Sequence, residues 1–378
     1  DGGVFVQLPP WYVDQRVTLA QGITVTALDT AAKTATLSDG NTVSYGKTLY
    51  ATGGRPRTLD ITGMNLPSVF VLRTLDDATA IRQALEAITA AGATPNVVVV
   101  GSGFIGLEGA ANALFKGAQV TLVDPVARAW VGMVPPGVSS YIQTQFSRRG
   151  ATLYYDHAVS GFIAGPDGKL SATRIANIQD TNAQPIEIAC DLAIVGVGIQ
   201  LNSELADAAG LATDPRHGVV VDDHLRASAA DVYAAGDVAA YPDPVAGRMH
   251  FEHWDNAIAS AQTAAANLTG GDEIYRHVPY FFSDQFDLAI NMLGYPSAMA
   301  TLVVRGDVTK DAFTTLFAEG GILRAAMMVN DDAQMDLLRE LIAANTRLPA
   351  DLAPLGDPTF DLATLKQADA PANAPAGE

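Results

Sequence analysis

The stretch NVVVVGSGFIGLEGAANALFKGAQVTLVD, residues 96–124, decides the fold class. Residues 96–100 are an almost unbroken β-branched run, which is typical of a strand buried on both faces of a parallel sheet. Glycine-rich residues 101–106 follow, and residues 104–116 predict a helix closed by Gly117. A second strand is expected at 119–124. A strand, glycine turn, helix and strand form a βαβ unit, so the sequence predicts an α/β fold.

Each glycine of the Gly101-x-Gly103-x-x-Gly106 pattern has a physical task in dinucleotide binding. Gly101 allows a tight turn, Gly103 lets the backbone approach a pyrophosphate, and Gly106 lets the helix pack on the strand. The helix N-terminus adds free N–H groups and the positive end of a dipole. Asp124 ends the next strand, where it is expected to accept hydrogen bonds from ribose hydroxyls and to favour NAD over NADP. The alternative is a glycine turn in an unrelated α/β unit.

The flanking sequence predicts more strands and a change of architecture near residue 272. Thr74 and Asp77 predict a capping box at a helix start. Strand signals and turn signals alternate over 151–190. Further strands are expected at 23–28, 33–37, 42–45, 48–51, 191–197 and 231–235, and, in a mostly antiparallel sheet, at 289–292, 299–304, 313–317 and 322–329. Further helices are expected at 74–90, 138–149, 253–268 and 332–344.

The composition excludes several classes of function. A length of 378 residues suffices for two to three domains. The formal net charge of −18 argues against nucleic acid or an anionic membrane as partner, because both bind basic surfaces. No apolar run reaches the roughly 18 residues of a membrane span, and the first residues do not read as a signal peptide. The single cysteine, Cys190, forbids an internal disulfide and predicts a small core residue in a cytoplasmic protein.

Other short motifs carry weaker signals. DVYAAGD at 231–237 delivers Asp237 at a strand end, either to hydrogen-bond a ligand hydroxyl or to serve as a turn or capping residue. ATGGRPR at 51–57 brings two glycines and two arginines to one loop. Glu108 either points away from a bound phosphate or acts as a helix-dipole residue. The histidines predict no metal site, because no ligand cluster completes the His250–His253 pair.

Together these motifs resemble a known family. The chain is similar, from about Leu19 to Leu365, to FAD-dependent, NADH-using ferredoxin reductases of the oxygenase-coupled type. These belong to the pyridine nucleotide-disulfide oxidoreductase superfamily, and the chain also resembles its apoptosis-inducing-factor-like branch. The segments that carry the resemblance are ATGGRPR (51–57), VFVLRTLDDA (69–78), VVVVGSGFIGLEGA (97–110), DLAIVGVGIQLN (191–202), DVYAAGD (231–237), FEHWDNA (251–257) and PYFFSDQFDL (279–288).

The resemblance implies sites for FAD and NAD(H). Asp237 would hold the ribityl–phosphate region of FAD, Arg73 its phosphate or flavin, and Trp254 would bring backbone to the pyrimidine edge of the flavin. Glu108 and Phe282 would flank the nicotinamide as the catalytic pair. The remaining implied contacts are Val25, Thr52, Gly53 and Gly236 for FAD, and Gly101, Gly103, Phe104, Ile105, Gly106, Asp124, Gly196 and Gly198 for NAD(H).

The resemblance also implies an architecture: α/β, with two Rossmann-like nucleotide-binding domains, the first truncated, and a C-terminal α+β domain. We expect residues 1–73 and 203–271 to form the FAD domain, 74–202 the NAD domain, 272–365 a C-terminal reductase or dimerisation domain, and 366–378 a disordered tail. Residues 22–38 predict a hairpin. The family's first βαβ unit, with its own GxGxxG motif and a lysine near the flavin, does not precede this hairpin; about twenty loop-like residues stand there instead. The chain is therefore expected to be a fragment or to be impaired in FAD binding. Phe282 also stands where these reductases commonly have Trp, and Leu201–Asn202 replaces Pro-Asn.

The implied function is transfer of electrons from NADH through FAD to a [2Fe-2S] ferredoxin or a rubredoxin, and a homodimer is left open. Docking an acidic carrier on this acidic chain requires a local basic patch, for which Arg55, Arg57, Arg305 and Arg324 are the candidates. Three alternatives stay open: an NADH-responsive interaction protein like apoptosis-inducing factor, an NAD-binding pseudo-enzyme that has lost FAD, and a small-molecule reductase. Disulfide reductases are excluded, because their cysteine pair is absent.

Overall fold

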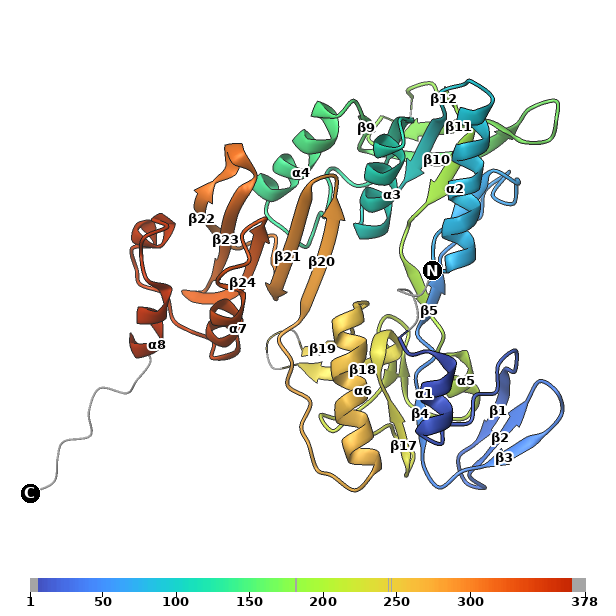
Figure 1. Cartoon of the computed structure of the whole chain (residues 1–378), viewed down its shortest axis with the longest axis vertical. Helices are drawn as coiled ribbons and strands as arrows, with labels where there is room; N and C mark the ends of the chain where they lie inside the picture. The colour runs from blue at the N-terminus through green and yellow to red at the C-terminus, as the bar shows by residue number, and fades with distance from the viewer. Residues whose placement is uncertain (1–5, 181, 244, 246, 369–378) are drawn as a thin grey trace, which may run out of the picture.

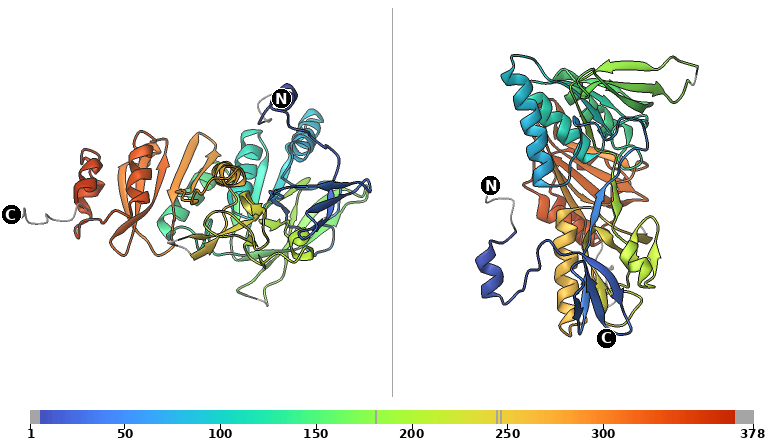
Figure 2. Two further views of the ribbon diagram at one scale, coloured as in Figure 1. Left: turned by 90° about the horizontal axis from the view of Figure 1, so that it is seen from below. Right: turned by 90° about the vertical axis from the view of Figure 1, so that its right-hand side faces the viewer.

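The chain folds into three groups of elements, seen in a computed structural model that describes residues 6–180, 182–243, 245 and 247–368 (Figure 1). The central lobe holds residues 69–195, and the split lobe joins residues 25–50 to residues 213–268. The C-terminal lobe holds residues 280–368. In the left view of Figure 2 the C-terminal lobe extends to one side of the other two.

The central lobe is built on a five-stranded parallel sheet in the order β6-β13-β7-β8-β9. Its strands are β6 (Val69–Val71), β13 (Leu192–Val195), β7 (Asn96–Val100), β8 (Gln119–Val123) and β9 (Thr152–Tyr154), and its helices are α2 (Leu75–Ala90), α3 (Phe104–Phe115) and α4 (Pro136–Arg148). The predicted βαβ unit is β7–α3–β8 and is confirmed. Residues 97–100 are at most 2% exposed, as a strand with both faces covered requires.

An antiparallel meander covers the second face of this sheet. It consists of β10 (His157–Ala164), β11 (Leu170–Asn177) and β12 (Ile186–Ala189). Phe162 and Ile175 of the meander pack with Val98 and Val195 of the sheet in one core. The sheet also recruits β6, which lies on the N-terminal side of the boundary expected between residues 73 and 74.

The split lobe joins segments that are far apart in the sequence. β4 (Thr48–Tyr50) pairs in parallel with β17 (Val232–Ala234), and a separate antiparallel sheet is formed by β1 (Val25–Asp29), β2 (Thr34–Leu37) and β3 (Thr42–Ser44). The other elements of this lobe are β15 (Thr213–Asp214), β16 (Gly218–Val220), β18 (Ala239–Asp243), β19 (Gly247–Met249), the 3₁₀ turn η2 (Gly236–Val238) and α6 (Trp254–Leu268). The predicted hairpin is confirmed.

The sequence suggested that the residues before the hairpin are loop-like, but part of this segment is helical. Pro9–Asp14 form a short helix, α1, with Pro at its start, where the missing N–H of proline costs no hydrogen bond. None of its residues is buried, and both views of Figure 2 show it on the outside of the molecule.

The C-terminal lobe is an antiparallel sheet in the order β20-β21-β24-β23-β22, backed by α7 (Met335–Ala343). Its strands are β20 (Tyr280–Gln285), β21 (Leu288–Gly294), β22 (Thr301–Asp307), β23 (Ala312–Glu319) and β24 (Ile322–Val329). The expected antiparallel sheet is confirmed, but β20 was not predicted as a strand. Residues 366–368 of the expected disordered tail belong instead to α8 (Leu365–Ala368), and the rest of that tail, 369–378, lies outside the described residues.

The chain crosses between the split and central lobes twice, and the two crossings pair with each other. β5 (Gly54–Pro56) and β14 (Ile199–Leu201) form a two-stranded antiparallel ribbon, followed by the short helix α5 (Glu204–Ala208). A Cβ on Gly54 would lie 2.5 Å from Ile199 Cδ1 and 3.0 Å from the carbonyl oxygen of Gln200, so a larger residue here would require the Ile199 side chain to move. Within the described part of the chain no helix is both long and apolar enough to span a membrane.

Candidate functional site

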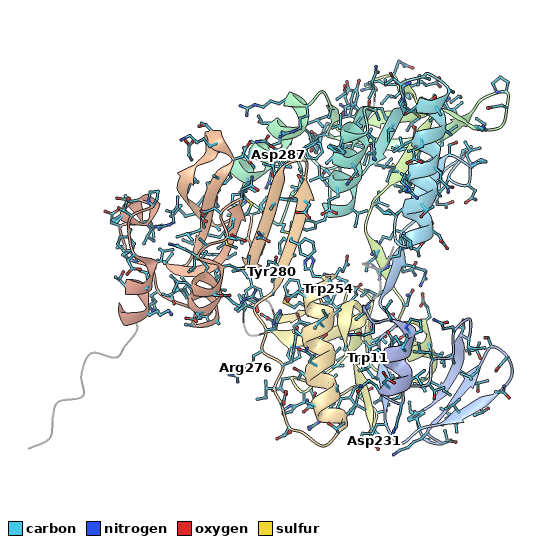
Figure 3. The ribbon with its side chains drawn as sticks, viewed as in Figure 1. Trp11, Asp231, Trp254, Arg276, Tyr280 and Asp287 are labelled. Carbon is cyan, nitrogen blue, oxygen red and sulfur yellow. The ribbon has the colours of Figure 1, made fainter. Side chains whose placement is uncertain are left out.

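A cleft of about 520 Å³ opens where the three lobes meet. Most of its lining comes from the start of α3, the segment from β13 to β14, the residues at and just before the start of α6, and β20, and Pro56 and Leu72 complete it. Figure 3 shows Trp254 of the split lobe and Tyr280 of the C-terminal lobe close together at this junction. Trp254 and Phe282 are 66% and 51% exposed, so two large aromatic side chains stand open to a ligand.

The glycine turn divides into two packing positions and one open position. Gly101 has a φ of +101°, and a Cβ on it would lie 2.3 Å from the carbonyl oxygen of Gly196. A Cβ on Gly106 would lie 1.9 Å from the carbonyl oxygen of Gly101. Gly103 meets nothing within 4 Å, and as the N-cap of α3 it makes no side-chain cap. The free N–H groups of α3 are thus approachable at Gly103, as an anion site requires.

Gly196 is needed for packing as well as for the cleft. A Cβ there would lie 3.0 Å from the amide nitrogen of Gly106. Gly198, with a φ of +91°, meets no neighbour and lines the cleft beside it. Phe104 and Ile105 line the same cleft from the first turn of α3.

Asp124 is bound first to the glycine turn itself. Its Oδ2 accepts hydrogen bonds from the amide of Ser102 at 2.5 Å and from its hydroxyl at 2.6 Å, and its Oδ1 accepts from the amide of Val126 at 3.0 Å. Asp124 as a whole residue is only 8% exposed. A carboxylate has about four acceptor positions, so about one is left for a ribose hydroxyl.

Glu108 points away from the glycine turn and toward the C-terminal lobe. It is the fifth residue of α3 and lies just beyond the first turn of that helix. Its Oε1 accepts a hydrogen bond from the hydroxyl of Ser283 at 2.7 Å. Burial raises the pKa of the carboxyl group above its usual range, and the Ser283 hydrogen bond acts in the opposite direction. Of the two alternatives, Glu108 therefore follows the first: its side chain points away from the turn where a phosphate would bind, and Ser283 is its hydrogen-bond partner.

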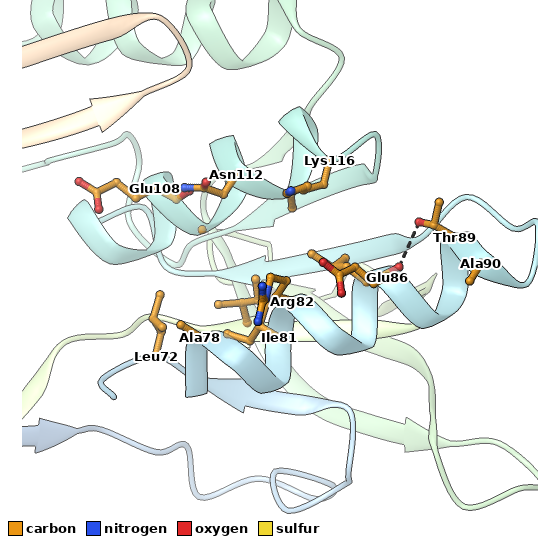
Figure 4. A pocket seen from close by; sticks show the side chains of 14 residues that line it. Leu72, Ala78, Ile81, Arg82, Glu86, Thr89, Ala90, Glu108, Asn112 and Lys116 are labelled. Atoms are coloured by element: carbon orange, nitrogen blue, oxygen red, sulfur yellow. Dashed lines mark hydrogen bonds between the residues drawn. The ribbon is translucent and has the colours of Figure 1, made fainter. Parts of the chain in front are cut away.

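Glu108 also joins the cleft to a second cavity. Figure 4 shows an apolar groove of about 650 Å³ between α2 and α3, with Glu108 at one end and Lys116 toward the other. Leu72 and Glu108 line both the groove and the cleft.

The start of α6 presents free backbone donors to the cleft. His253 is its N-cap and makes no side-chain cap, and Trp254 and Asp255 follow in the first turn. The His253 ring stacks on Phe281 with centroids 4.5 Å apart and contacts Phe104 edge-on at 5.9 Å. Burial lowers the pKa of His253 to about 4, so this ring is neutral at physiological pH.

A second polar group lies on the split-lobe side. Asp237, in the 3₁₀ turn after β17, lies 3.6 Å from Arg73 Nη2, and Gly53 faces both side chains. Burial raises the pKa of Asp237, while the Arg73 charge lowers it. Gly53 and Gly236 have φ values of +57° and +74°. The structure thus brings together residues from three separate motifs.

Other implied FAD contacts lie in the same lobe but in different settings. Thr52 donates its hydroxyl to the carbonyl oxygen of Asn202 at 2.7 Å, so it is part of the crossing ribbon. Val25 is 39% exposed at the start of β1, in the separate β1–β2–β3 sheet. Neither residue lines the cleft described above.

The expected basic patch is wrong for Arg305. Its side chain is 4% exposed and donates to the carbonyl oxygens of Leu355 and Phe360, so it ties the C-terminal segment to β22. Arg55 is paired with Glu204 at 2.6 Å, and Arg324 donates to Asn345. Only the Arg55 bond pairs a guanidinium with an acid. Arg324 donates to a neutral amide and Arg57 to the carbonyl oxygen of Ile199, so these two side chains keep their positive charge.

Cys190 behaves as predicted. It is 4% exposed, belongs to the core under the meander, and lies 3.2 Å from the Thr173 hydroxyl. Burial raises the pKa of its thiol to about 11. It is therefore a core residue and not a nucleophile.

The sequence reasoning missed Ser283, Gln285 and His253. Ser283 and Gln285 alternate with exposed residues along β20 and are 0% exposed. Two polar residues at the buried positions of a strand are an unusual pattern that could have drawn attention to them. For His253 no comparable signal exists, since its neutral state depends on the rings around it.

Comparison with known proteins identifies the family. The profile of the pyridine nucleotide-disulphide oxidoreductases matches residues 12–264, and that of the reductase C-terminal domain matches residues 280–366. The first match spans more than half of the chain. The chain belongs to the pyridine nucleotide-disulphide oxidoreductase family. Within this family it carries only one cysteine.

Its relatives in this family are ferredoxin reductases. It is 36% identical to the ferredoxin–NAD(+) reductase component of the anthranilate 1,2-dioxygenase system of Burkholderia cepacia, over 96% of this chain and 85% of the relative. It is 31% identical to putidaredoxin reductase of Pseudomonas putida, over 95% and 82%. A solved ferredoxin reductase from Rhodopseudomonas palustris superposes with a TM-score of 0.87, at 30% identity over 98% and 86%. The fold class and the reductase family expected from the sequence are confirmed, and the chain is an oxidoreductase of a flavoprotein family.

Proposed function

We propose that this chain takes reducing equivalents from NADH through FAD and delivers them to a ferredoxin-type carrier. The observation that carries the proposal is the cleft, because it brings the start of α3, Glu108, the start of α6 and Phe282 to one place. The relatives named as ferredoxin reductases support the nature of the acceptor. We assign the split lobe to FAD and the central lobe to NADH, as the resemblance implies.

The described residues fit FAD. Gly53, Arg73 and Asp237 form a small cradle in which one carboxylate and one guanidinium face each other at 3.6 Å. We assign Asp237 to ribityl hydroxyls and Arg73 to phosphate or flavin oxygens, because these are the charges that those groups recognise. The uncapped N–H groups at Trp254 suit an electron-rich edge of a flavin ring. When bound, FAD accepts a hydride and releases electrons singly.

The central lobe would bind NADH. The open approach at Gly103 receives the pyrophosphate, and the remaining acceptor position of Asp124 receives a ribose hydroxyl. Glu108 and Phe282 border the nicotinamide, the first through its carboxylate and the second through an exposed ring. His253, held neutral, adds no charge to this space.

The protein's surroundings and partner surface follow from the same observations. The unpaired, buried thiol supports a reducing compartment, and we place the protein in the cytoplasm. We keep a [2Fe-2S] ferredoxin or rubredoxin as the carrier, but the carrier must dock without Arg305.

An anaerobic titration tests the proposal. The purified protein is loaded with FAD, and NADH is added while the flavin absorbance is followed; a ferredoxin and cytochrome c are then supplied as acceptors. Bleaching by NADH followed by fast turnover with ferredoxin supports the proposal. Bleaching with slow turnover favours an interaction protein like apoptosis-inducing factor. A folded protein that binds NADH but retains no flavin contradicts the proposal for this chain, and favours either the pseudo-enzyme or a fragment that is impaired in FAD binding.

A further inference from the structure

Two buried polar side chains of β20 form a hydrogen-bonded chain that ends on Glu108. Gln285 Nε2 donates to Ser283 Oγ at 3.1 Å, and Ser283 Oγ donates to Glu108 Oε1 at 2.7 Å. Ser283 and Gln285 are both 0% exposed, so the bond between them is shielded from bulk water, whereas the bond to Glu108 is part-buried at the edge of the cleft. These two hydrogen bonds therefore connect the interior of the C-terminal lobe to a residue that lines the cleft.

The hydrogen bonds have a defined direction. An amide nitrogen can only donate, so the Ser283 oxygen accepts from Gln285 and its single proton is directed to Glu108. A hydroxyl proton directed at a carboxyl oxygen stabilises the ionised carboxylate more than the neutral acid. The Gln285 Oε1 atom is buried and has no partner among the described residues. Rotation of the amide by half a turn would give this oxygen the Ser283 proton and would require Glu108 to donate, as a neutral acid.

We propose that Ser283 and Gln285 are positioning residues that hold Glu108 ionised, as a hydrogen-bond acceptor for the carboxamide N–H of the nicotinamide. The inference rests on the proposed function, since that function places nicotinamide beside Glu108. It assigns to the C-terminal lobe a task in NADH recognition, in addition to covering the cleft.

The hydrogen bonds from Gln285 to Ser283 and from Ser283 to Glu108 are needed because the surroundings of Glu108 disfavour its negative charge. Burial raises its pKa, and the carboxylate of Asp284, the neighbour of Ser283, acts in the same direction. The Ser283 hydrogen bond opposes both. The other titratable or charged groups that share the two cavities with Glu108 are Arg82 and Glu86 of α2, Lys116 after α3, Tyr280 of β20, His250, Glu252 and His253 before α6, and Asp255 in its first turn.

The pH dependence of the KM for NADH tests the inference on the FAD-loaded protein. In the unmodified protein, KM should rise as the pH falls and Glu108 becomes protonated. Ser283→Ala should move this inflection upward by about one pH unit, so that KM is up to about tenfold higher between the two inflections while kcat changes less. Gln285→Leu should move it in the same direction by a smaller amount, because it removes the group that directs the Ser283 proton.

Glu108→Gln provides the matched control. Its KM profile should lack the inflection, and adding Ser283→Ala to it should change KM no further. Ser283→Thr, which keeps the hydroxyl, should restore the inflection. An unchanged inflection in Ser283→Ala, a shift to lower pH, or an equal KM increase in the Glu108→Gln background overturns the inference.

Direct binding keeps the two proposals apart. NADH fluorescence titrations over the same pH range report Kd without flavin turnover, and should show the same shifts in Ser283→Ala. If the unmodified protein binds NADH with this pH dependence but does not reduce its flavin, the proposed function fails and the positioning role stands. If flavin reduction is normal and Kd shows no such dependence, only the positioning role fails.

Discussion

Gly103→Ala and Gly106→Ala form a pair that separates ligand approach from packing. The two glycines lie three residues apart at the start of α3, so their substitutions are matched in chemistry and location. At Gly103 a methyl group meets no atom within 4 Å, and its φ of −77° suits alanine. At Gly106 the same methyl group would lie 1.9 Å from the carbonyl oxygen of Gly101, well inside van der Waals contact.

We expect Gly106→Ala to lower stability with little direct effect on NADH binding, and Gly103→Ala to weaken NADH binding with little effect on stability. Gly106→Ala forces backbone apart in a packed layer, which costs about 1–3 kcal/mol of folding free energy. Gly103→Ala should change stability by less than about 0.5 kcal/mol, since alanine's smaller loss of chain entropy offsets its poorer N-cap preference. Its methyl group instead stands where a pyrophosphate approaches, and we expect the Kd for NADH to rise about tenfold, or about 1.4 kcal/mol.

Thermal unfolding and NADH titration of both variants decide the matter. The reasoning predicts a lower unfolding midpoint for Gly106→Ala only, and a tenfold weaker NADH complex for Gly103→Ala at an unchanged midpoint. A Gly103→Ala variant that binds NADH as tightly as the unmodified protein would refute the anion site at this turn. A Gly106→Ala variant of normal stability would refute the close helix–strand contact.

Three further substitutions or treatments test the remaining contacts. Asp124→Ala should lower stability by about 1–3 kcal/mol, because Ser102 loses its acceptor, and should lower the ratio of kcat/KM for NADH to that for NADPH; an unchanged ratio would contradict its role. Arg73→Met should raise the pKa of Asp237 further. A raised acid pKa costs stability only where the group is ionised, so the loss in the thermal unfolding midpoint should grow as the pH rises and vanish in acid. A loss that does not depend on pH would argue against the Arg73–Asp237 pair. Cys190 should resist thiol reagents in the folded protein and react after denaturation, with the pKa of about 11 as the reason; rapid labelling of the folded protein would show that the core is open.

The central lobe was predictable because its signals are local. The run 96–100, the glycines and the strand ending at Asp124 each depend on neighbours within a few residues, and β7–α3–β8 forms as expected. The Thr74–Asp77 capping box is likewise formed, and it needs only one helical turn. The family resemblance then supplied the cofactors and the reaction class.

The missed features depend on contacts between distant segments. β20 contains three large aromatic residues in its first half and polar residues in its second, and its strand conformation is fixed by pairing with β21. Arg305 was read as a surface charge, but three backbone carbonyl oxygens from residues 355–360 bind its guanidinium group. The partner of Glu108 lies 175 residues away. No local pattern reports such meetings.

The paired crossings of the chain have a mechanical consequence. Because β5 and β14 are hydrogen-bonded to each other, the two connections between the lobes cannot move independently. Asn202 adds to this coupling, since its side chain binds the Thr52 carbonyl oxygen and accepts from Arg55. A narrow two-stranded strap of this kind resists sliding but yields to twisting about its length. We therefore expect the split lobe to move relative to the central lobe by twisting of this ribbon, which would turn the start of α6 relative to the start of α3 across the cleft.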